Sequence, residues 1–335
     1  MYKKVKKVML PGEYSFQDDN VEFIRRSFIF PDLSEKALHV RLFFKKDCLL
    51  KIQNVENNLN FSFFRLEPKL ISVLNYTSRN QRLFIPRHQY PDILIKTLLS
   101  IEDRFFYNHN GINISAIGRA CLVNLMAGKI VQGGSTLTQQ LVKNLFLTNT
   151  RSIWRKINEI YMALILDFFY KKDRILELYL NEVYLGQDGD EQIRGFPLAS
   201  LHYFGRPIDE LNLDQYALLV GMVKGASLYN PWSNPEVALN RRNLVLLSLY
   251  KQGLIKKNIY EKLSQRALNI YPKGYVISDY PDFLELVRIE IKKKLKNKII
   301  NFSGMRIFTT LDVISKNSVE KTINKEVPIL KKKKN

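Results

Sequence analysis

The chain has 335 residues, of which 46% are hydrophobic, so it can form one large domain or a core domain with smaller ones, and a wholly disordered chain is excluded. Lys and Arg outnumber Asp and Glu by 52 to 32, and the net charge of +20 favours an anionic partner such as a phosphorylated substrate, a membrane surface or nucleic acid. Two cysteines are too few for a disulfide framework, and no run approaches the ~18 consecutive apolar residues of a membrane span.

The first part of the chain predicts a small β-rich domain over residues 1–65. Apolar residues alternate with mostly polar or basic neighbours over 38–44, which is typical of a half-buried strand. Similar short runs lie at 21–28 and 49–55, separated by turn-rich stretches. A linker is expected over 66–90.

From about residue 90 the apolar period becomes helical, which predicts a mainly α domain over 91–265 and a linker region over 266–335. Pro91 can open a helix, Gly128 can end one, and Ser152 can cap a long one. Asn212 with the glutamine three residues later forms a capping-box pattern. Helices are predicted over 91–101, 114–127, 136–147, 152–169, 173–185, 193–204, 213–224, 236–252 and 281–297.

A carboxylate cluster, Glu102-Asp103-Arg104, comes directly after the first of these helices, with His109 and Gly111 close behind. A carboxylate in that place can be shielded from water, which raises its pKa toward the value that a general base needs. Taken alone, such a run is more typical of a charged surface cluster.

A glycine pair, Gly133-Gly134, precedes the third predicted helix. Backbone N–H groups at a helix N-terminus can bind an anion, and glycines let the anion approach. The run is not a P-loop, because Gly-x-x-x-x-Gly-Lys-Ser/Thr is absent. A flexible turn before a Ser- or Thr-capped helix explains the pair equally well.

The start of the long fourth helix is basic. Arg151, Arg155 and Glu159 fall on one helical stripe, and Arg155-Lys156 lies in the first turn, where the helix dipole disfavours each cation by ~0.3–1 kcal/mol. Cations placed against the dipole favour an anion-binding role. The alternative is a surface Arg–Glu pair worth roughly 0.2–0.5 kcal/mol.

Five runs together resemble glycosyltransferase family 51, the peptidoglycan glycosyltransferase domain of class A bifunctional penicillin-binding proteins, and most closely the 1b type. Five motifs in the family's order over about 110 residues are far more specific than any one of them. The runs are 102–111 (EDRFFYNHNG), 133–140 (GGSTLTQQ), 155–159 (RKINE), 174–186 (RILELYLNEVYLG) and 194–205 (RGFPLASLHYFG).

The resemblance implies a mainly α, lysozyme-like domain with a cleft, preceded by a small, truncated α+β accessory domain. It implies an inverting reaction that polymerises lipid II into β-1,4-linked glycan and releases undecaprenyl pyrophosphate. Glu102 would be the general base and Glu159 the second catalytic carboxylate. The substrate-binding residues that it implies are Asp103, Phe106, His109, Ser135, Thr136, Gln140, Lys143, Asn144, Arg151 and Arg155.

The resemblance also implies partners and a location. The partners are lipid II, the lipid-linked glycan chain, a membrane surface and a lipoprotein activator on residues 1–65; none is a nucleic acid. Some family members use Mg²⁺ or Mn²⁺ at the donor pyrophosphate, but His109 and His202 each lack a second His or Cys at ligand spacing, so no protein metal site is predicted. The expected location is the periplasmic face of the bacterial inner membrane, although no anchor or signal is visible in the chain.

Two other functions stay open on the sequence: a non-catalytic scaffold for cell-wall synthesis and a muramidase-like hydrolase. Intact Glu102 and Glu159 disfavour the scaffold, and the cationic cluster disfavours the hydrolase, which has no pyrophosphate to bind. A transpeptidase is not expected. The runs 248–251 and 318–321 match Ser-x-x-Lys, but no Lys-Thr-Gly or Lys-Ser-Gly follows.

Overall fold

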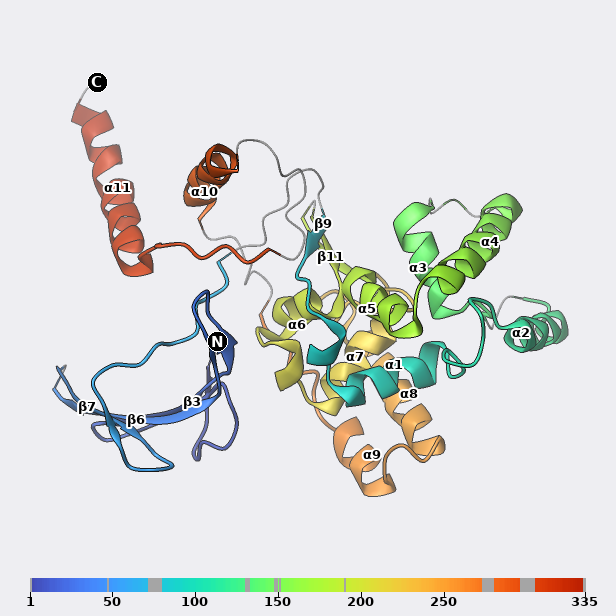
Figure 1. Ribbon diagram of the computed structural model, residues 1–335, viewed down its shortest axis with the longest axis horizontal. Helices are drawn as coiled ribbons and strands as arrows, with labels where there is room; N and C mark the ends of the chain where they lie inside the picture. Colours follow the sequence, from blue (N-terminus) through green and yellow to red (C-terminus); the bar gives the residue numbers. More distant parts are fainter. Residues whose placement is uncertain are drawn as a thin grey trace. The chain divides into compact units, whose positions relative to one another are not determined.

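The protein forms two compact units, residues 1–279 and residues 280–335. The first unit holds an N-terminal sheet and a helical body, and the second holds two helices (Figure 1). The computed structural model describes residues 2–46, 48–71, 80–129, 133–147, 150, 152–189, 191–272, 280–295 and 305–333.

The described part of the N-terminal domain consists of strands, turns and loops. Its strands are β1 (Lys3–Lys4), β2 (Glu13–Gln17), β3 (Asn20–Arg25), β4 (Phe28–Ile29), β5 (Ser34–Glu35), β6 (Leu38–Lys45), β7 (Cys48–Asn54) and β8 (Asn60–Phe61). Six of them form one sheet in the order β1-β2-β3-β6-β7-β8, in which β1 and β2 are parallel and the other pairs antiparallel. Phe23 and Val40 pair across β3 and β6 and are buried, so the alternating pattern places one face on a small core.

The rest of the first unit is mainly helical. Its helices are α1 (Asp92–Glu102), α2 (Ile114–Ala127), α3 (Leu137–Phe146), α4 (Ile153–Phe169), α5 (Lys172–Glu182), α6 (Phe196–Phe204), α7 (Leu213–Met222), α8 (Pro235–Lys251) and α9 (Lys257–Ser264), with 3-10 turns η1 (Arg87–Gln89) and η2 (Ile208–Glu210). A mainly α body after a small sheet domain confirms the predicted fold class.

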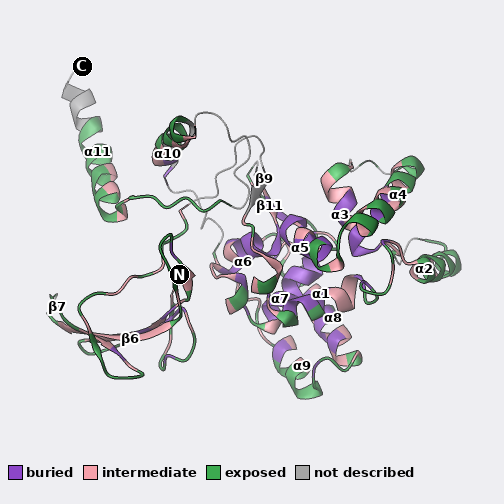
Figure 2. Ribbon diagram, in the orientation of Figure 1, coloured by how far each residue is buried: buried purple, intermediate pink, exposed green. Residues whose placement is uncertain are grey.

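One hydrophobic core joins α1, α3, α5, α6 and α7. Leu98, Leu141, Leu176 and Leu219 are fully buried in it, one from each of α1, α3, α5 and α7. Burying side chains of this kind stabilises a fold by about 1.5–3 kcal/mol each. Figure 2 shows buried residues concentrated on α1, α5 and α7, whereas α2 and much of α4 are exposed and project away from this core.

The predicted helix over 193–204 is wrong at its start. A three-stranded sheet forms there, in the order β10-β11-β9, from β9 (Asn80–Arg82), β10 (Tyr184–Asp188) and β11 (Glu191–Arg194). The helix α6 begins only after Gly195, which has φ +80° and whose missing Cβ would lie 2.6 Å from a backbone oxygen of α5. The predicted helix over 173–185 is too long for the same reason: residues after α5 pair in the sheet.

The second unit contains α10 (Pro281–Lys294) and α11 (Val313–Lys333). The first agrees with the predicted helix over 281–297 up to residue 294. Both α11 and α9 are helices that the apolar pattern did not predict; in α11 the exposed Ile314, Val319 and Ile323 are spaced by five and then four residues. None of the described helices combines the length and the apolar character needed to cross a bilayer.

Candidate active site

Glu102 is the last residue of α1 and is half-buried. Its Oε2 atom accepts a hydrogen bond of 3.0 Å from Nε2 of Gln140 on α3. Burial raises the pKa of Glu102 above the ordinary value, and the Gln140 hydrogen bond and the charges of Arg241 and Lys224 partly oppose this rise. The direction agrees with the possibility, raised from the sequence, that this carboxylate is shielded from water, and the role of general base stays a prediction. A raised pKa suits a carboxylate that takes a proton near neutral pH.

Helix α5 holds the segment that leads into α1. Asn181 accepts a hydrogen bond of 3.0 Å from the backbone N–H of Ile85 and donates one of 2.9 Å to its carbonyl. Glu177 accepts a hydrogen bond of 2.8 Å from the backbone N–H of Arg87. Glu177 and Asn181 are both buried, so these polar residues of the run 174–186 fix backbone rather than face solvent.

Asp103 connects the end of α1 to the start of α3. Its Oδ2 atom accepts a hydrogen bond of 3.0 Å from the backbone N–H of Leu137, the first residue of α3, where the helix dipole favours an anion. His109 Nε2 lies 3.0 Å from the same oxygen. Asp103 is buried and its carboxylate is occupied by protein partners. The substrate contacts predicted for Asp103 and His109 stay predictions.

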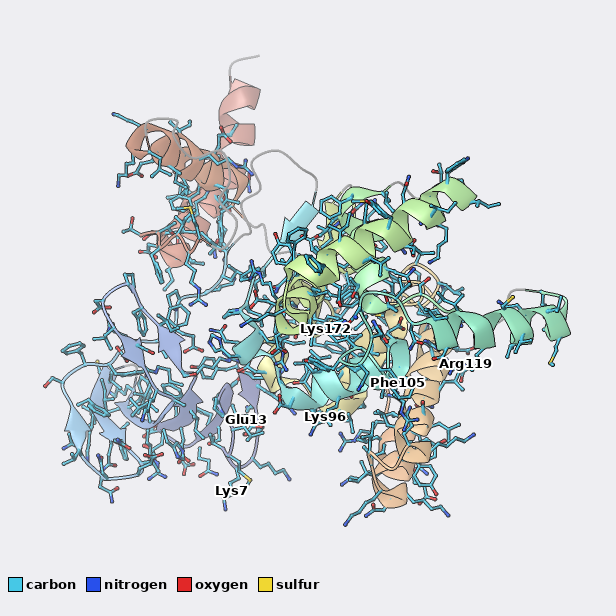
Figure 3. The ribbon with its side chains drawn as sticks, turned by 45° about the vertical axis from the view of Figure 1, so that its right-hand side comes forward. Lys7, Glu13, Lys96, Phe105, Arg119 and Lys172 are labelled. Carbon is cyan, nitrogen blue, oxygen red and sulfur yellow. The ribbon has the colours of Figure 1, made fainter. Side chains whose placement is uncertain are left out.

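Phe106 lies in the loop after α1 and is 1% exposed, so its ring is covered by protein. The ring meets His109 edge-on, with centroids 6.2 Å apart. Lys172, which is labelled in Figure 3 and opens α5, places Nζ 4.7 Å from the ring centre and also pairs with Asp167 at 2.7 Å. The predicted substrate contact of Phe106 stays a prediction.

Thr136 caps α3 and ties it to the preceding loop. Its hydroxyl accepts a hydrogen bond of 3.2 Å from the N–H of Gln139 and donates one of 2.6 Å to the carbonyl of Gly111. The Gln139 side chain completes a capping box by accepting from the Thr136 N–H at 2.9 Å. Gly111 has φ +80°, and a Cβ there would lie 2.5 Å from the carbonyl oxygen of Ala163 on α4. Loop, α3 and α4 therefore meet at Gly111.

Glu159 is the centre of a cationic cluster at the start of α4. It is 3% exposed and accepts a hydrogen bond of 3.0 Å from Nη1 of Arg155. Lys156 Nζ donates to the other carboxylate oxygen of Glu159 and, at 2.6 Å, to Oγ of Ser135. The Arg155–Glu159 pair of the alternative interpretation is therefore formed, but its carboxylate is buried instead of lying on the surface. Both carboxylate oxygens hold cations, which fixes the two side chains in place.

The charges of both glutamates, Glu102 and Glu159, act on Lys143 of α3. It is half-buried on α3, and its side chain makes no hydrogen bond or ion pair with a described residue. Burial lowers the pKa of its ammonium, and the positive charges of Arg155 and Lys156 lower it further. The negative charges of Glu159 and Glu102 act in the opposite direction on the same pKa. The pKa of Lys143 is therefore sensitive to the charge of both carboxylates.

The remaining predicted substrate-binding residues lie around this cluster. Asn144 follows Lys143 on α3, is half-buried, and its side chain makes no hydrogen bond with a described residue. Ser135 precedes the Thr136 cap and is the acceptor for Lys156. Arg151 lies outside the described residues. The predicted roles of Ser135, Asn144 and Arg151 stay predictions.

The sequence analysis did not identify three residues that act on Glu102 or on its partner Gln140. Tyr179 on α5 is fully buried and donates a hydrogen bond of 2.8 Å to Oε1 of Gln140. Lys224 follows α7, and Arg241 lies on α8 and donates at 3.1 Å to the carbonyl of Gly221. All three lie far from α1 in the sequence, Tyr179 and Arg241 on helices and Lys224 in the turn after α7. The only local signal was that Tyr179 lies inside one of the five motif runs.

Exposed apolar side chains cover α2 and α4, which Figure 2 shows as largely exposed. Arg119, labelled in Figure 3, adds a cation to α2. A surface of this kind is typical of proteins that meet lipid or another protein. The exposed residues are Ile114, Ile117, Leu122, Leu125 and Met126 of α2 and Ile153, Trp154, Ile157, Tyr161, Leu164, Ile165, Phe168 and Phe169 of α4.

Within the described ranges, no three His, Cys, Asp or Glu residues lie close enough together to hold a metal ion. Glu159, the carboxylate at the centre of the cationic cluster, already uses both oxygens for Arg155 and Lys156. Basic side chains suit an anion better than a divalent cation, and the anion-binding role of this cluster stays a prediction.

Two family models match the chain. One, described as transglycosylase, matches residues 68–250, and the other, described as bifunctional transglycosylase second domain, matches residues 1–66. Both matches agree with the order of domains that the structure shows: the sheet first and the helical body after it.

Curated relatives are similar over the whole chain. It is 68% identical over 334 residues to penicillin-binding protein 1B of Buchnera aphidicola subsp. Acyrthosiphon pisum and 57% identical over 331 residues to penicillin-binding protein 1B of Escherichia coli strain K12. It is 48% identical over 331 residues to the protein of that name from Vibrio cholerae. These alignments take in 99–100% of this chain but 44%, 39% and 43% of the three relatives, so the chain spans less than half of their length.

Proposed function

The chain belongs to the transglycosylase family, and we propose that it is a peptidoglycan glycosyltransferase that polymerises lipid II into β-1,4-linked glycan. One observation carries the proposal: helix α3 lies against both groups. Its Gln140 hydrogen-bonds the half-buried Glu102 at 3.0 Å, and Ser135, just before it, hydrogen-bonds Lys156 of the cluster around Glu159 at 2.6 Å. The first group suits proton abstraction from a sugar hydroxyl. The second suits a pyrophosphate leaving group.

Glu102 acts as the general base in this proposal. It takes the proton of the acceptor 4-hydroxyl while that oxygen attacks the anomeric carbon of the donor glycan. The bond from the anomeric carbon to the pyrophosphate oxygen breaks as the new glycosidic bond forms, so the configuration inverts. The proton rests on Glu102 and the electron pair leaves with undecaprenyl pyrophosphate.

The pyrophosphate is bound by the cations of α3 and α4. Lys143 is half-buried and has no carboxylate partner among the described residues, so its charge is available to an anion. Arg155 has a planar guanidinium group that matches phosphate oxygens. Its Nη1 atom donates a hydrogen bond of 3.0 Å to Glu159, which orients the group. Preorganised cations stabilise the negative charge that develops on the leaving oxygen.

Glu159 positions these cations rather than exchanging protons. Its oxygens are both engaged, by Arg155 and by Lys156, and it is almost fully buried. A carboxylate held in this way keeps two side chains oriented that would otherwise repel each other. The contribution of Glu159 to catalysis is therefore electrostatic support of the pyrophosphate site.

The same cations favour a glycosyltransferase over a glycan hydrolase. A muramidase-like enzyme cleaves a neutral glycosidic bond and has no use for Lys143 and Arg155 beside the second glutamate. A divalent cation at the pyrophosphate, which the family resemblance allows, would take its ligands from phosphate oxygens, because Glu159 offers no unused oxygen. The proposed steps use only the chain's own residues.

A membrane surface is the second proposed partner. Lipid II is anchored by its lipid, so the enzyme has to work at the bilayer, and the exposed apolar residues of α2 and α4 support contact there. The net charge of +20 adds attraction to anionic lipid headgroups. The proposed location is the periplasmic face of the bacterial inner membrane, where the peptidoglycan precursor is used.

A lipoprotein activator is the third proposed partner, on the sheet domain. The match of residues 1–66 to the second domain of bifunctional transglycosylases supports a separate, non-catalytic role for it. The domain exposes Leu50 on β7 and Leu59 just before β8, which a protein partner could cover. Stimulation of polymerisation by such a lipoprotein, and its loss in Leu50→Asp, would test the role.

The activity itself is tested with lipid II in detergent. Wild-type protein should make glycan polymer, and Glu102→Gln should lower turnover by at least about a hundredfold, because an amide cannot accept the proton. The variant should melt no lower than wild type: burial raises the pKa of Glu102, so its charged form costs stability above the unfolded-state pKa, and glutamine removes that cost. Glu261→Gln, on the exposed face of α9, is the matched control and should retain full activity. More than about a tenth of wild-type turnover in Glu102→Gln would rule out the base role.

A further inference from the structure

Three side chains from three helices form a hydrogen-bonded chain that ends on Glu102. The Tyr179 hydroxyl of α5 donates to Oε1 of Gln140 at 2.8 Å, and Nε2 of Gln140 on α3 donates to Oε2 of Glu102 at 3.0 Å. Tyr179 is fully buried, while Gln140 and Glu102 are half-buried. The chain therefore runs from the core outward to the proposed base.

The orientation of the Gln140 amide decides whether its NH₂ group or its carbonyl oxygen faces the Glu102 carboxylate. The NH₂ end donates a hydrogen bond, which stabilises a carboxylate, whereas the carbonyl end would place one acceptor against another. The two ends have the same shape, so packing alone cannot choose between them. The choice needs a neighbour whose surroundings require it to donate, or one that can only accept.

Tyr179 provides that choice. A fully buried hydroxyl has to donate its hydrogen to avoid the cost of an unmade hydrogen bond, about 1–3 kcal/mol. Among the described residues its hydroxyl bonds only with Gln140. Burial also raises the pKa of Tyr179 well above its ordinary value, so the hydroxyl keeps its proton. The amide carbonyl is thereby held on the tyrosine side.

We propose that Tyr179 is a positioning residue for the Glu102 base and acts through Gln140, by holding the amide with its NH₂ group toward the carboxylate. The inference rests on the proposed function for its catalytic meaning. The positioning itself is a property of the folded chain. It can therefore be measured in the absence of substrate.

Other charged groups also act on Glu102. Arg241 and Lys224 reach it from α8 and the end of α7, Asp103 from its own helix end, and Lys143 from α3. None of them hydrogen-bonds with the Tyr179 hydroxyl. Removing that hydroxyl leaves these charges unchanged, so a change at Glu102 then reports the amide alone.

The experiment is a carboxyl ¹³C NMR titration of Glu102, with its signal assigned by its disappearance in Glu102→Gln. In Tyr179→Phe the amide is free to turn, so the titration midpoint should rise by roughly half a pH unit or more. Gln140→Ala should raise it as well. Tyr179→Phe added to Gln140→Ala should cause no further shift, because a residue that acts through Gln140 has no effect without it.

Tyr203→Phe is the matched control. It removes an equally buried hydroxyl, whose hydrogen bond of 2.9 Å goes to the carbonyl of Leu185, away from the proposed base. Its melting temperature should fall about as much as that of Tyr179→Phe, while the Glu102 midpoint stays at the wild-type value. An unchanged midpoint in Tyr179→Phe, or a further shift in the double variant, would overturn the proposal.

Polymerisation of lipid II separates the positioning role from the proposed function. In Tyr179→Phe the acid limb of the turnover profile should move to higher pH, because protonated Glu102 cannot act as a base. If wild-type protein makes no polymer but the midpoints shift as expected, the function fails and the positioning stands. If polymer forms and the midpoints do not move, Tyr179 has only a structural role.

Discussion

The residues of the proposed site differ in whether their polar groups are already bonded to other groups of the protein. Asp103, Thr136 and Glu159 are buried and occupied by protein partners, so their geometry supports their neighbours. Glu102 and Lys143 are half-buried, and Lys143 has no partner among the described residues. Few side chains of the proposed site are therefore left for a substrate, and one of them, Glu102, is held by Gln140, which is itself hydrogen-bonded by Tyr179.

Arg155 carries the first prediction at this scale. Arg155→Ala should lower polymer turnover by roughly two orders of magnitude, about 3 kcal/mol, because a preorganised cation at the leaving group is lost. The free energy of unfolding should fall by about 1–2 kcal/mol, because the buried Glu159 then has Lys156 as its one remaining cationic partner among the described residues. Arg155→Lys should restore turnover only in part, because an ammonium is not a bidentate fork.

The matched control for Arg155 is Arg288→Ala, which breaks an exposed pair of 3.2 Å with Glu285 on α10. Turnover should stay normal and stability should change by less than about 0.5 kcal/mol. Turnover and thermal melting are measured for all three variants together. Near-normal turnover in Arg155→Ala would remove the pyrophosphate role from this residue and favour the hydrolase alternative again.

At the scale of elements, one close approach of backbone to backbone joins the site loop to α4. Gly111 has φ +80°, and a Cβ there would lie 2.5 Å from the carbonyl oxygen of Ala163. Gly111→Ala should therefore lower the free energy of unfolding by about 2–4 kcal/mol, as left-handed strain and overpacking add. Gly128→Ala is the control: its φ is +61°, but nothing lies within 4 Å, so about 1 kcal/mol is expected. Equal losses in urea melts would contradict the close approach.

The apolar surface of α2 and α4 gives a prediction on vesicles. Leu125 and Phe168 are 78% and 84% exposed, and burying each in lipid contributes up to about 1.5–3 kcal/mol. The double variant Leu125→Ser, Phe168→Ser should bind anionic vesicles at least about tenfold more weakly with unchanged melting, followed by the fluorescence of Trp154. Leu244→Ser with Leu254→Ser keeps the same net charge and removes exposed leucines elsewhere, so its binding should match wild type. Equal weakening in both pairs would exclude a specific role for α2 and α4.

At the scale of the whole molecule, this chain should not react with penicillin. Ser248 lies on α8, where its hydroxyl accepts a hydrogen bond of 3.0 Å from Gln252, and Ser318 lies on α11, where its hydroxyl donates at 2.9 Å to the carbonyl of Ile314. Neither Ser-x-x-Lys run has the partner motifs of a penicillin-binding site. A fluorescent penicillin should leave no covalent label on a denaturing gel, with a bifunctional relative as positive control. Acylation of either serine, mapped by mass spectrometry, would show that the reading of these runs is wrong.

The sequence by itself determined the parts that depend on near neighbours. Ser152 caps α4, Gly128 ends α2 in the left-handed conformation, and Asn212 forms its capping box with Gln215, as the local patterns predicted. Caps and the helical period involve residues within about four positions, so one segment contains the whole signal. The motif runs likewise located Glu102 and Glu159, because they are short and ordered.

Only the tertiary structure decided what surrounds those two glutamates. Tyr179 holds Gln140, the partner of Glu102, and the charges of Lys224 and Arg241 act on Glu102 from parts of the chain far away in sequence. No local pattern marks which side chains will face each other. The last two residues of the strand Glu191–Arg194 were predicted as the start of a helix for the same reason: the strand pairs with Asn80–Arg82, more than 100 residues away. Local propensity is worth a few tenths of a kcal/mol per residue, whereas burial and pairing across the fold contribute several times that amount and therefore prevail.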